Sequence, residues 1–83
     1  MDIIEVFAKN LKKYRNEMGL SQEAFAEKSV LHRTYFSALE CKKRSIALDN
    51  VQKIAEALEI EPYLLFVEET EKKKGGPFRN ERL

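Results

Sequence analysis

Cysteine, glycine and proline are scarce in this sequence, and each shortage excludes a class of protein. The one cysteine, Cys41, cannot form a disulfide within the chain, so a disulfide scaffold is excluded. Only three glycines and two prolines occur, a composition that favours helices over a disordered chain. The longest apolar run, YLLFV, is far shorter than the roughly 20 residues of a membrane-spanning helix. The stretch MDIIEVFAK lacks a basic start and a long apolar run, so we expect a cytoplasmic protein without signal peptide or membrane segment.

The chain is long enough for one small domain. Its 83 residues are 43% hydrophobic, which suffices for a single core and leaves no room for a second. We expect this domain to span residues 1–69. Residues 70–83 form a basic tail with three lysines, two glycines and a proline but no apolar period, so we expect this tail to be disordered.

Apolar residues recur at spacings of three and four, the period of amphipathic helices. The predicted helices are Ile3 to Met18, Gln22 to about Lys28, about Arg33 to Glu40, about Leu48 to Leu58, and a short fifth helix that starts at Glu61 and Pro62. Ser21 is placed to cap the second helix, whereas Ala47 stands where the fourth helix would have a capping side chain. Gly19 stands where a glycine ends the first helix. The sequence therefore predicts an all-α domain of five helices.

Charge is unevenly distributed although the net charge is only +1. Residues 28–45 contain five Lys or Arg and one Glu, whereas residues 49–69 contain one Lys and six Asp or Glu. The pattern predicts a positive end around the third helix and a negative end beyond it. Such an arrangement favours the approach of a polyanion to the positive end.

The segment HRTYFSALE, residues 32–40, has an unusual helical face. At about 100° per residue, one side carries Tyr35, Phe36 and Leu39. The other side carries Arg33, Thr34, Ser37 and Ala38, which are one long donor and three small groups. Solvated faces usually carry pairs of Glu and Lys, so this face favours close approach to another molecule. An ordinary solvent face is the alternative for this helix taken alone.

Two short helices joined by a tight break form a helix-turn-helix unit, whose second helix can enter the major groove of DNA. The stretch LSQEAFAEKSVLHRTYFSALE resembles this unit, at about residues 21–40, in the phage-repressor and Cro-type (XRE) transcription factor family. The matching positions are Gln22, Ala26, Phe36 and Leu39. The resemblance extends from Leu11 to about Phe66, and it implies a five-helix domain of the phage-repressor type. Within the family, HRTYFSALE is most similar to the recognition helix of controller proteins of restriction-modification genes.

The resemblance implies roles for individual residues. The residues expected to face DNA bases are Arg33, Thr34 and Ser37, and Arg33 can donate two hydrogen bonds to a guanine. Gln22 matches a phosphate contact of the family, and the basic residues beside the unit are expected on phosphates too, namely Lys28, Lys42, Lys43 and Arg44. Arg15 and Glu40 match the positions of an internal ion pair that ties the first helix to the third. Glu40 is therefore expected to be structural.

The sequence departs from the family pattern at two positions. Val30 stands where the turn between the two helices usually has Gly, and Lys42 stands where another Gly commonly follows the recognition helix. A β-branched residue disfavours positive φ. Either the turn takes a different backbone path, or Val30 is strained. Both alternatives bear on the angle of the third helix.

Three other residues near the third helix have more than one interpretation. We expect His32 to cap or flank this helix, with a phosphate or base-edge contact as the alternative. Tyr35 lies at the edge of the helical wheel and belongs either to the core or to the DNA flank. Cys41 is expected to be incidental, because a redox switch needs an activated and exposed thiolate.

The sequence lacks the parts of an enzyme. It has one His and one Cys, no phosphate-binding glycine loop, and no carboxylate pair tied to a nucleophile. We therefore expect no catalysis, metal, cofactor or small-molecule ligand. The favoured function is sequence-specific transcriptional regulation, with double-stranded DNA as the partner. The alternative is an antitoxin or adaptor that holds a partner protein through YLLFV or the basic tail.

We also expect a homodimer. One recognition helix contacts only a few base pairs, and two-fold pairing matches a palindromic site with half-sites about one helical turn apart. The expected interface is the apolar cluster near the fifth helix, namely Tyr63, Leu64, Phe66 and Val67. The alternative is that this cluster only closes the core.

Overall fold

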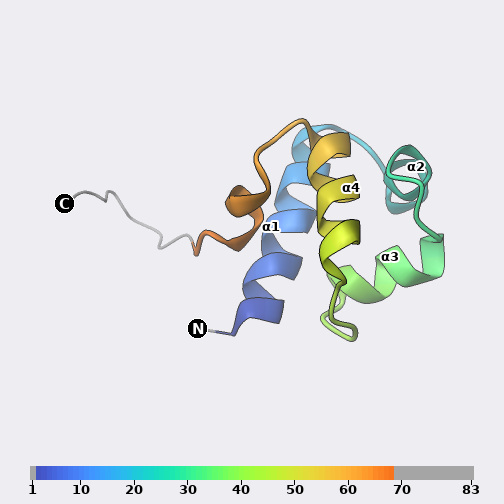
Figure 1. Cartoon of the computed structure of the whole chain (residues 1–83). Helices are drawn as coiled ribbons and strands as arrows, with labels where there is room; N and C mark the ends of the chain where they lie inside the picture. Colours follow the sequence, from blue (N-terminus) through green and yellow to red (C-terminus); the bar gives the residue numbers. More distant parts are fainter. Residues whose placement is uncertain (1, 69–83) are drawn as a thin grey trace.

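The computed structural model describes residues 2–68, which contain four α-helices, one 3-10 helix and no strand (Figure 1). The elements are α1 (Ile3–Glu17), α2 (Gln22–Lys28), α3 (Arg33–Glu40), α4 (Leu48–Leu58) and the 3-10 helix η1 (Pro62–Phe66). The predicted all-α class is confirmed. Within this described part of the chain, every helix is too short or too polar to cross a membrane. The tail expected at residues 70–83 lies outside the described residues.

The helix starts follow the local sequence. The Asp2 carboxylate accepts hydrogen bonds from Ile4 N and Glu5 N at 3.0 and 3.3 Å, and the Ser21 hydroxyl accepts one from Ala24 N at 3.0 Å. Both side chains satisfy N–H groups that have no partner within the helix. Ala47 provides no side-chain bond at the start of α4, as its sequence predicts.

Two predicted elements differ in detail from the observed ones. The first helix ends at Glu17, with Met18 as its C-cap, because Gly19 takes a left-handed conformation at φ 74° and stops the helix. The fifth element is a 3-10 helix of five residues, closed by a Leu64 N to Glu61 O bond of 3.0 Å. Short helical segments commonly take this tighter form.

The turn between α2 and α3 keeps a regular path despite its missing glycine. Val30 adopts φ 60°, and its N–H donates to Glu27 O at 3.1 Å while Leu31 N donates to Ala26 O at 2.8 Å. This pair of bonds is the Schellman motif that usually has glycine at the left-handed position. Lys42, at φ 65°, ends α3 in the same way. Of the two alternatives for Val30, the structure therefore has the usual backbone path with a β-branched residue at positive φ.

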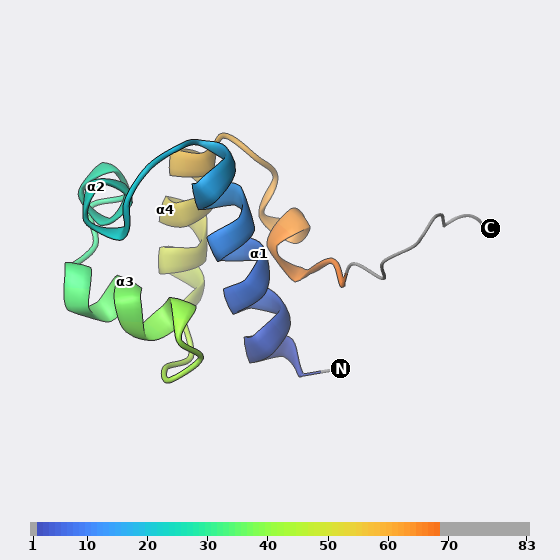
Figure 2. The ribbon, with the colours of Figure 1, turned by 180° about the vertical axis from the view of Figure 1, so that it is seen from behind.

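Packing joins the helix-turn-helix unit to the other elements. In Figures 1 and 2, α2 and α3 form one end of the molecule, and η1 lies on the opposite side, where it contacts α1 and α4. The ring centres of Phe25 in α2 and Phe36 in α3 lie 5.3 Å apart. Those of Phe7 in α1 and Phe66 in η1 lie 5.5 Å apart. The fully buried large side chains at the centre are Phe25, Phe36, Leu11, Leu39, Ile54 and Leu65. Because α3 buries only Phe36 and Leu39, its opposite face is open.

Candidate nucleic-acid interface

The open face of α3 is a shallow hollow of about 290 Å³. It is lined by Arg33, Thr34, Ser37, Ala38, Cys41 and Lys43. The three residues predicted to face bases therefore share one surface. Arg33 and Thr34 are exposed, whereas Ser37 and Ala38 are half-buried, so the small residues form the floor and Arg33 stands at the rim.

His32 is the N-cap of α3. Its Nδ1 accepts a hydrogen bond from Thr34 N at 3.2 Å. A neutral imidazole that accepts through Nδ1 carries its hydrogen on Nε2, so the exposed ring retains one donor. The capping bond also fixes the first turn of α3, where Arg33 and Thr34 lie.

A buried carboxylate holds α3 against the rest of the domain. Glu40 accepts from Arg15 Nε at 2.6 Å and Arg15 Nη2 at 3.1 Å, and the side chains of Glu40 and Arg15 are 2% and 9% exposed. Gln22 Nε2 donates to the same carboxylate at 2.9 Å, and Arg15 Nη1 donates to Leu20 O at 2.7 Å. The cluster joins α1, α2 and α3. Gln22, expected on a phosphate, thus uses one of its two amide hydrogens within the protein.

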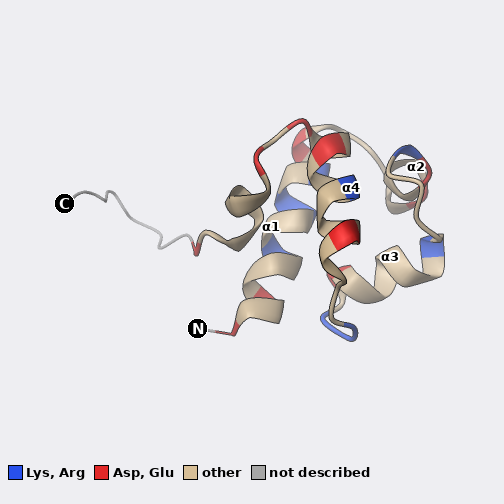
Figure 3. Cartoon of the chain, in the orientation of Figure 1, with Lys and Arg blue, Asp and Glu red and all other residues tan. Residues whose placement is uncertain are grey.

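Exposed positive charge precedes and follows α3 in the sequence. Lys28, at the end of α2, and Lys42, Lys43 and Arg44, in the loop after α3, are all exposed. Figure 3 shows Lys and Arg at the start of α3 and in this loop, and Asp and Glu along α4. Glu40, the one acid of residues 28–45, is neutralised by Arg15 inside the protein. The exposed charge beside the hollow is therefore positive.

One carboxylate from outside this segment reaches the basic loop. Glu5 Oε2 lies 3.6 Å from Lys42 Nζ, and both side chains are more than half exposed. An ion pair of this kind is typically weak, contributing about 0 to 1 kcal/mol. Lys42 is therefore readily available to another anion.

Tyr35 has contacts that sequence reasoning did not find. Asn50 Nδ2, at the start of α4, donates to Tyr35 Oη at 3.1 Å, and Arg44 Cζ lies 5.3 Å from the centre of the Tyr35 ring. The ring is half-buried, so it belongs to the edge of the core and also flanks the basic loop. No periodicity connects residues 35 and 50, because they lie on different helices.

The residues expected to form a dimer interface border different hollows. Tyr63 is 64% exposed and borders an apolar hollow together with half-buried Phe66, whereas Val67 borders a polar pocket and Leu64 lines neither. Sequence reasoning missed Leu48, which is 86% exposed although it is apolar. We define the apolar face as Ile3, Ile4, Leu48, Tyr63 and Phe66, which border two adjoining hollows of about 220 and 570 Å³. Apolar periodicity does not reveal that Leu48 is exposed, because Leu48 fits the pattern as the first residue of the fourth helix.

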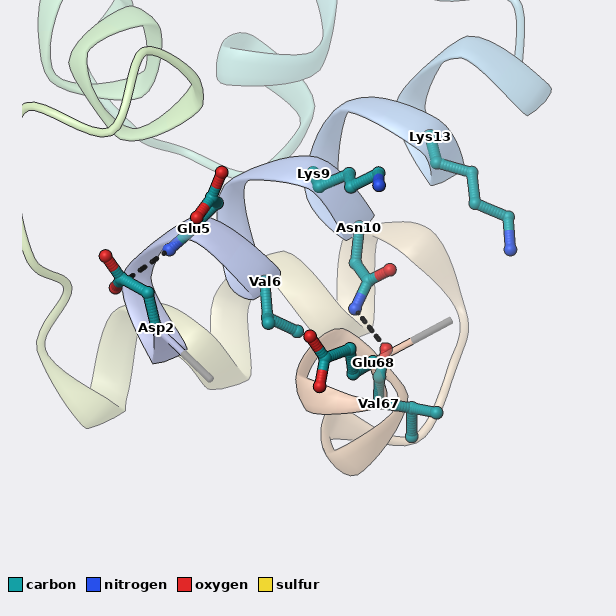
Figure 4. A pocket seen from close by; sticks show the side chains of 8 residues that line it. All are labelled: Asp2, Glu5, Val6, Lys9, Asn10, Lys13, Val67 and Glu68. Atoms are coloured by element: carbon teal, nitrogen blue, oxygen red, sulfur yellow. Dashed lines mark hydrogen bonds between the residues drawn. The ribbon is translucent and has the colours of Figure 1, made fainter. Parts of the chain in front are cut away.

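A polar pocket of about 430 Å³ lies between α1 and the chain after η1 (Figure 4). Its lining consists of Asp2, Glu5, Val6, Lys9, Asn10, Lys13, Val67 and Glu68. Asn10 is 5% exposed, and its Nδ2 donates to Leu65 O and Val67 O, both at 2.9 Å. Asn10 therefore ties η1 and the segment after it to α1. In the described range 2–68, no cluster of His, Cys, Asp and Glu is suited to a metal ion.

The fold and this surface together define a helix-turn-helix protein. Helix α2 supports α3 through Phe25 and Phe36, a tight turn joins them, and α3 presents an open face between exposed cations. The helix-turn-helix family model matches residues 11–65. The chain belongs to this family, and the predicted resemblance to XRE-type helix-turn-helix proteins is confirmed.

The chain is similar to controller proteins of restriction-modification systems and to related solved structures. The chain is 48% identical to control protein C.SmaI of Serratia marcescens over 58 residues, which are 70% of this chain and 69% of that protein. The crystal structure of the hypothetical transcription factor NHTF from Neisseria has a TM-score of 0.78 and 42% identity, over 81% of this chain and 77% of that one. The restriction-modification controller protein C.Esp1396I, crystallised as a tetramer with its natural 35 base-pair operator, has a TM-score of 0.72 and 32% identity, over 80% and 87%. The resemblance to controller proteins is therefore confirmed as well.

Proposed function

We propose that this chain is a sequence-specific DNA-binding transcriptional regulator that binds a palindromic operator as a homodimer and controls restriction-modification genes. The observation that carries the proposal is the open face of α3, where Arg33, Thr34 and Ser37 line one hollow. The similarity to C.Esp1396I, which was crystallised with its operator, supports the same conclusion. A protein of this kind needs no catalytic group, and we expect no enzymatic activity.

The bases are read from the floor and rim of the hollow. Arg33 is exposed at the first position of α3, and its guanidinium can donate to O6 and N7 of one guanine. Thr34 and Ser37 each offer a hydroxyl, which donates or accepts and so discriminates less than a bidentate arginine. Ala38 lets the helix approach closely because its side chain ends at Cβ.

The phosphates are held by exposed groups that precede and follow the residues of the hollow in the sequence. The exposed cations are Lys28, Lys42, Lys43 and Arg44, which lie on both sides of α3 in sequence. Gln22 keeps a second amide hydrogen after its bond to Glu40, and the exposed His32 ring keeps one donor on Nε2. These contacts position the protein on the duplex without reading its sequence.

Dimerisation would cover the apolar face. Leu48 and Tyr63 are large, apolar and mostly exposed, and they adjoin hollows that a partner side chain can fill. Large contiguous apolar patches are rare on monomeric proteins and usually mark an interaction site. A two-fold pair places two α3 helices on one duplex, which fits a palindromic operator. Tyr63 and Phe66 are the predicted interface residues that this surface retains, while the places of Leu64 and Val67 remain predictions.

A binding selection tests the proposed function. The parent protein is mixed with a pool of random duplexes, and bound sequences are enriched over several rounds. We expect a palindromic consensus that the parent prefers over a scrambled duplex at the same salt concentration. If no sequence is enriched, the protein is not a sequence-specific regulator, and a partner-holding role for the apolar face is favoured instead.

Arg33→Ala gives the site-specific arm of the test. Its preference for the selected duplex over the scrambled one should fall by about 1 to 3 kcal/mol per half-site, because alanine cannot form the bidentate pair with guanine. Lys9→Ala is the matched control, since it also removes one exposed positive charge but lies at the polar pocket beside α1. Both variants are first checked for helix content and unfolding free energy. If Arg33→Ala prefers the selected duplex as strongly as the parent does, Arg33 does not contact the bases.

A further inference from the structure

Asn50 is the one residue of α4 whose side chain bonds to the recognition helix in the described residues 2–68. Its Nδ2 donates to Tyr35 Oη at 3.1 Å, and the two residues lie 15 positions apart. Both side chains are half-buried, so the contact is neither a core bond nor a solvated one. Figure 1 shows that the loop after α3 turns back at the end of α3 and leads into the start of α4, and Asn50 is the third residue of α4.

The direction of this hydrogen bond determines whether the Tyr35 hydroxyl is available as a donor. A phenol oxygen can accept and donate at once. Because the amide N–H of Asn50 already points at Oη, the hydrogen of the hydroxyl must point elsewhere. Within residues 2–68 that hydrogen has no acceptor, and Tyr35 is partly open to solvent. The hydroxyl can therefore donate to a molecule outside the chain.

The surroundings of the ring are cationic. Arg44 Cζ lies 5.3 Å from the ring centre, and exposed Lys43 lies next to Arg44 in the chain. Cations and an available hydroxyl donor in one place suit an oxygen that carries negative charge. A DNA phosphate has this chemistry, and it accepts hydrogen bonds from tyrosine hydroxyls as well as from cations.

We propose that Asn50 is a positioning residue for DNA binding: it occupies the acceptor side of the Tyr35 hydroxyl, so that this hydroxyl donates to a backbone phosphate beside Arg44. The inference rests on the proposed function, since it assumes that the α3 surface meets DNA. In this proposal α4 contributes to DNA binding although the Asn50 side chain does not contact the DNA. Tyr35 contacts the phosphate, and Asn50 acts only through Tyr35.

Tyr35→Phe and Asn50→Ala test the proposal together with the double variant. The probes are the duplex selected by the parent protein and its scrambled counterpart. Phenylalanine retains the ring under Arg44 and removes only the hydroxyl. We expect each single variant to bind both duplexes about three- to tenfold more weakly per protomer, which is the usual worth of one hydrogen bond. The affinity of the double variant should fall no further than that of the worse single variant.

Two further readouts separate a phosphate contact from other roles. The ratio of affinities for the two duplexes should stay at the parent value, because a phosphate contact carries no sequence information. The slope of log affinity against log salt should also stay unchanged, because a neutral donor releases no counterion, whereas removal of Arg44 should lower it by about 0.9. Gln52→Ala is the matched control. It removes an amide of the same helix that is bonded to Glu56 at 3.1 Å, and it should bind like the parent.

Several outcomes would overturn the proposal. If both single variants unfold more easily but bind DNA like the parent, the bond only joins α3 to α4. If the affinity ratio falls, the hydroxyl reads a base, and if the two effects add in the double variant, Asn50 does not act through Tyr35. If Asn50→Ala does not fold, Tyr35→Phe alone decides, since unchanged affinity in that variant excludes the phosphate contact. Failure of the parent to prefer any duplex would instead reject the proposed function.

Discussion

Arg15 and Glu40 form a two-bond ion pair inside the protein, with distances of 2.6 Å from Nε to Oε2 and 3.1 Å from Nη2 to Oε1. The pair connects the end of α1 to the end of α3, and Gln22 joins α2 to the same carboxylate. It therefore sets the position of the recognition helix against the other two helices. It also removes the one acidic charge from the segment that is expected to meet DNA.

Breaking this pair from one side should be strongly destabilising. Glu40→Leu leaves the Arg15 guanidinium buried without its partner, and we expect the unfolding free energy to fall by about 3 to 5 kcal/mol. Arg15→Met with Glu40→Leu should be less destabilising than Glu40→Leu alone, because no buried charge remains unpaired. Urea unfolding followed by circular dichroism measures both. A destabilisation of the double variant equal to the sum of the two single effects would contradict this account.

The helix bounds can be predicted from the local sequence, whereas the ion pair between Arg15 and Glu40 cannot. Apolar spacing and Ser21 locate α2, α3 and α4, because local hydrogen bonding and burial of one face determine where these helices begin and end. The open face of α3 follows from the same wheel. Arg15 and Glu40 are 25 residues apart, and only the family resemblance connects them in advance.

Other contacts have no local signal. The bond from Asn50 to Tyr35 and those from Asn10 to the chain after η1 join distant segments, so they depend on how the helices pack. The exposure of Leu48 also depends on how the helices pack, so the sequence does not predict it. The path at Val30 could not be chosen from sequence either, because a β-branched residue at φ 60° is adopted only when surrounding packing and the two turn bonds outweigh its strain.

Val30→Gly should stabilise the protein. Val30 is 76% exposed, so the substitution removes little packing, and glycine relieves a left-handed conformation that costs an L-residue about 1 to 2 kcal/mol. Part of that gain is offset by the greater freedom of glycine in the unfolded chain, so we expect a net increase of about 1 kcal/mol in unfolding free energy. Val30→Ala is the control, since alanine keeps the unfavourable φ. Equal stability of the two variants would show that strain at Val30 is small.

Charge on the apolar face should prevent dimerisation. Leu48→Glu and Tyr63→Glu each place a carboxylate where a partner would exclude water, and an unpaired charge there is unfavourable. We expect the parent to sediment as a dimer at tens of micromolar and both variants as monomers. Met18→Glu is the control, because Met18 is also an exposed apolar residue but borders neither apolar hollow. A monomeric parent, or dissociation by Met18→Glu as well, would place the interface elsewhere or exclude it.

The loop after α3 should account for much of the salt dependence of DNA binding. Lys42, Lys43 and Arg44 are exposed, and removing a cation that contacts a phosphate should lower the slope of log affinity against log salt by about 0.9. We therefore expect the triple alanine variant to bind selected and scrambled duplexes more weakly by a similar factor and with a shallower slope. Glu5→Gln should raise overall affinity, because it removes the carboxylate that lies 3.6 Å from Lys42 Nζ and would compete with a phosphate for it. Lys9→Ala with Lys12→Ala is a partial control for lost charge, since it removes two positive charges from α1, outside the loop. A slope in the triple variant equal to that of the parent would mean that the loop does not touch the DNA backbone, and the positive charge beside α3 would then only steer DNA from a distance.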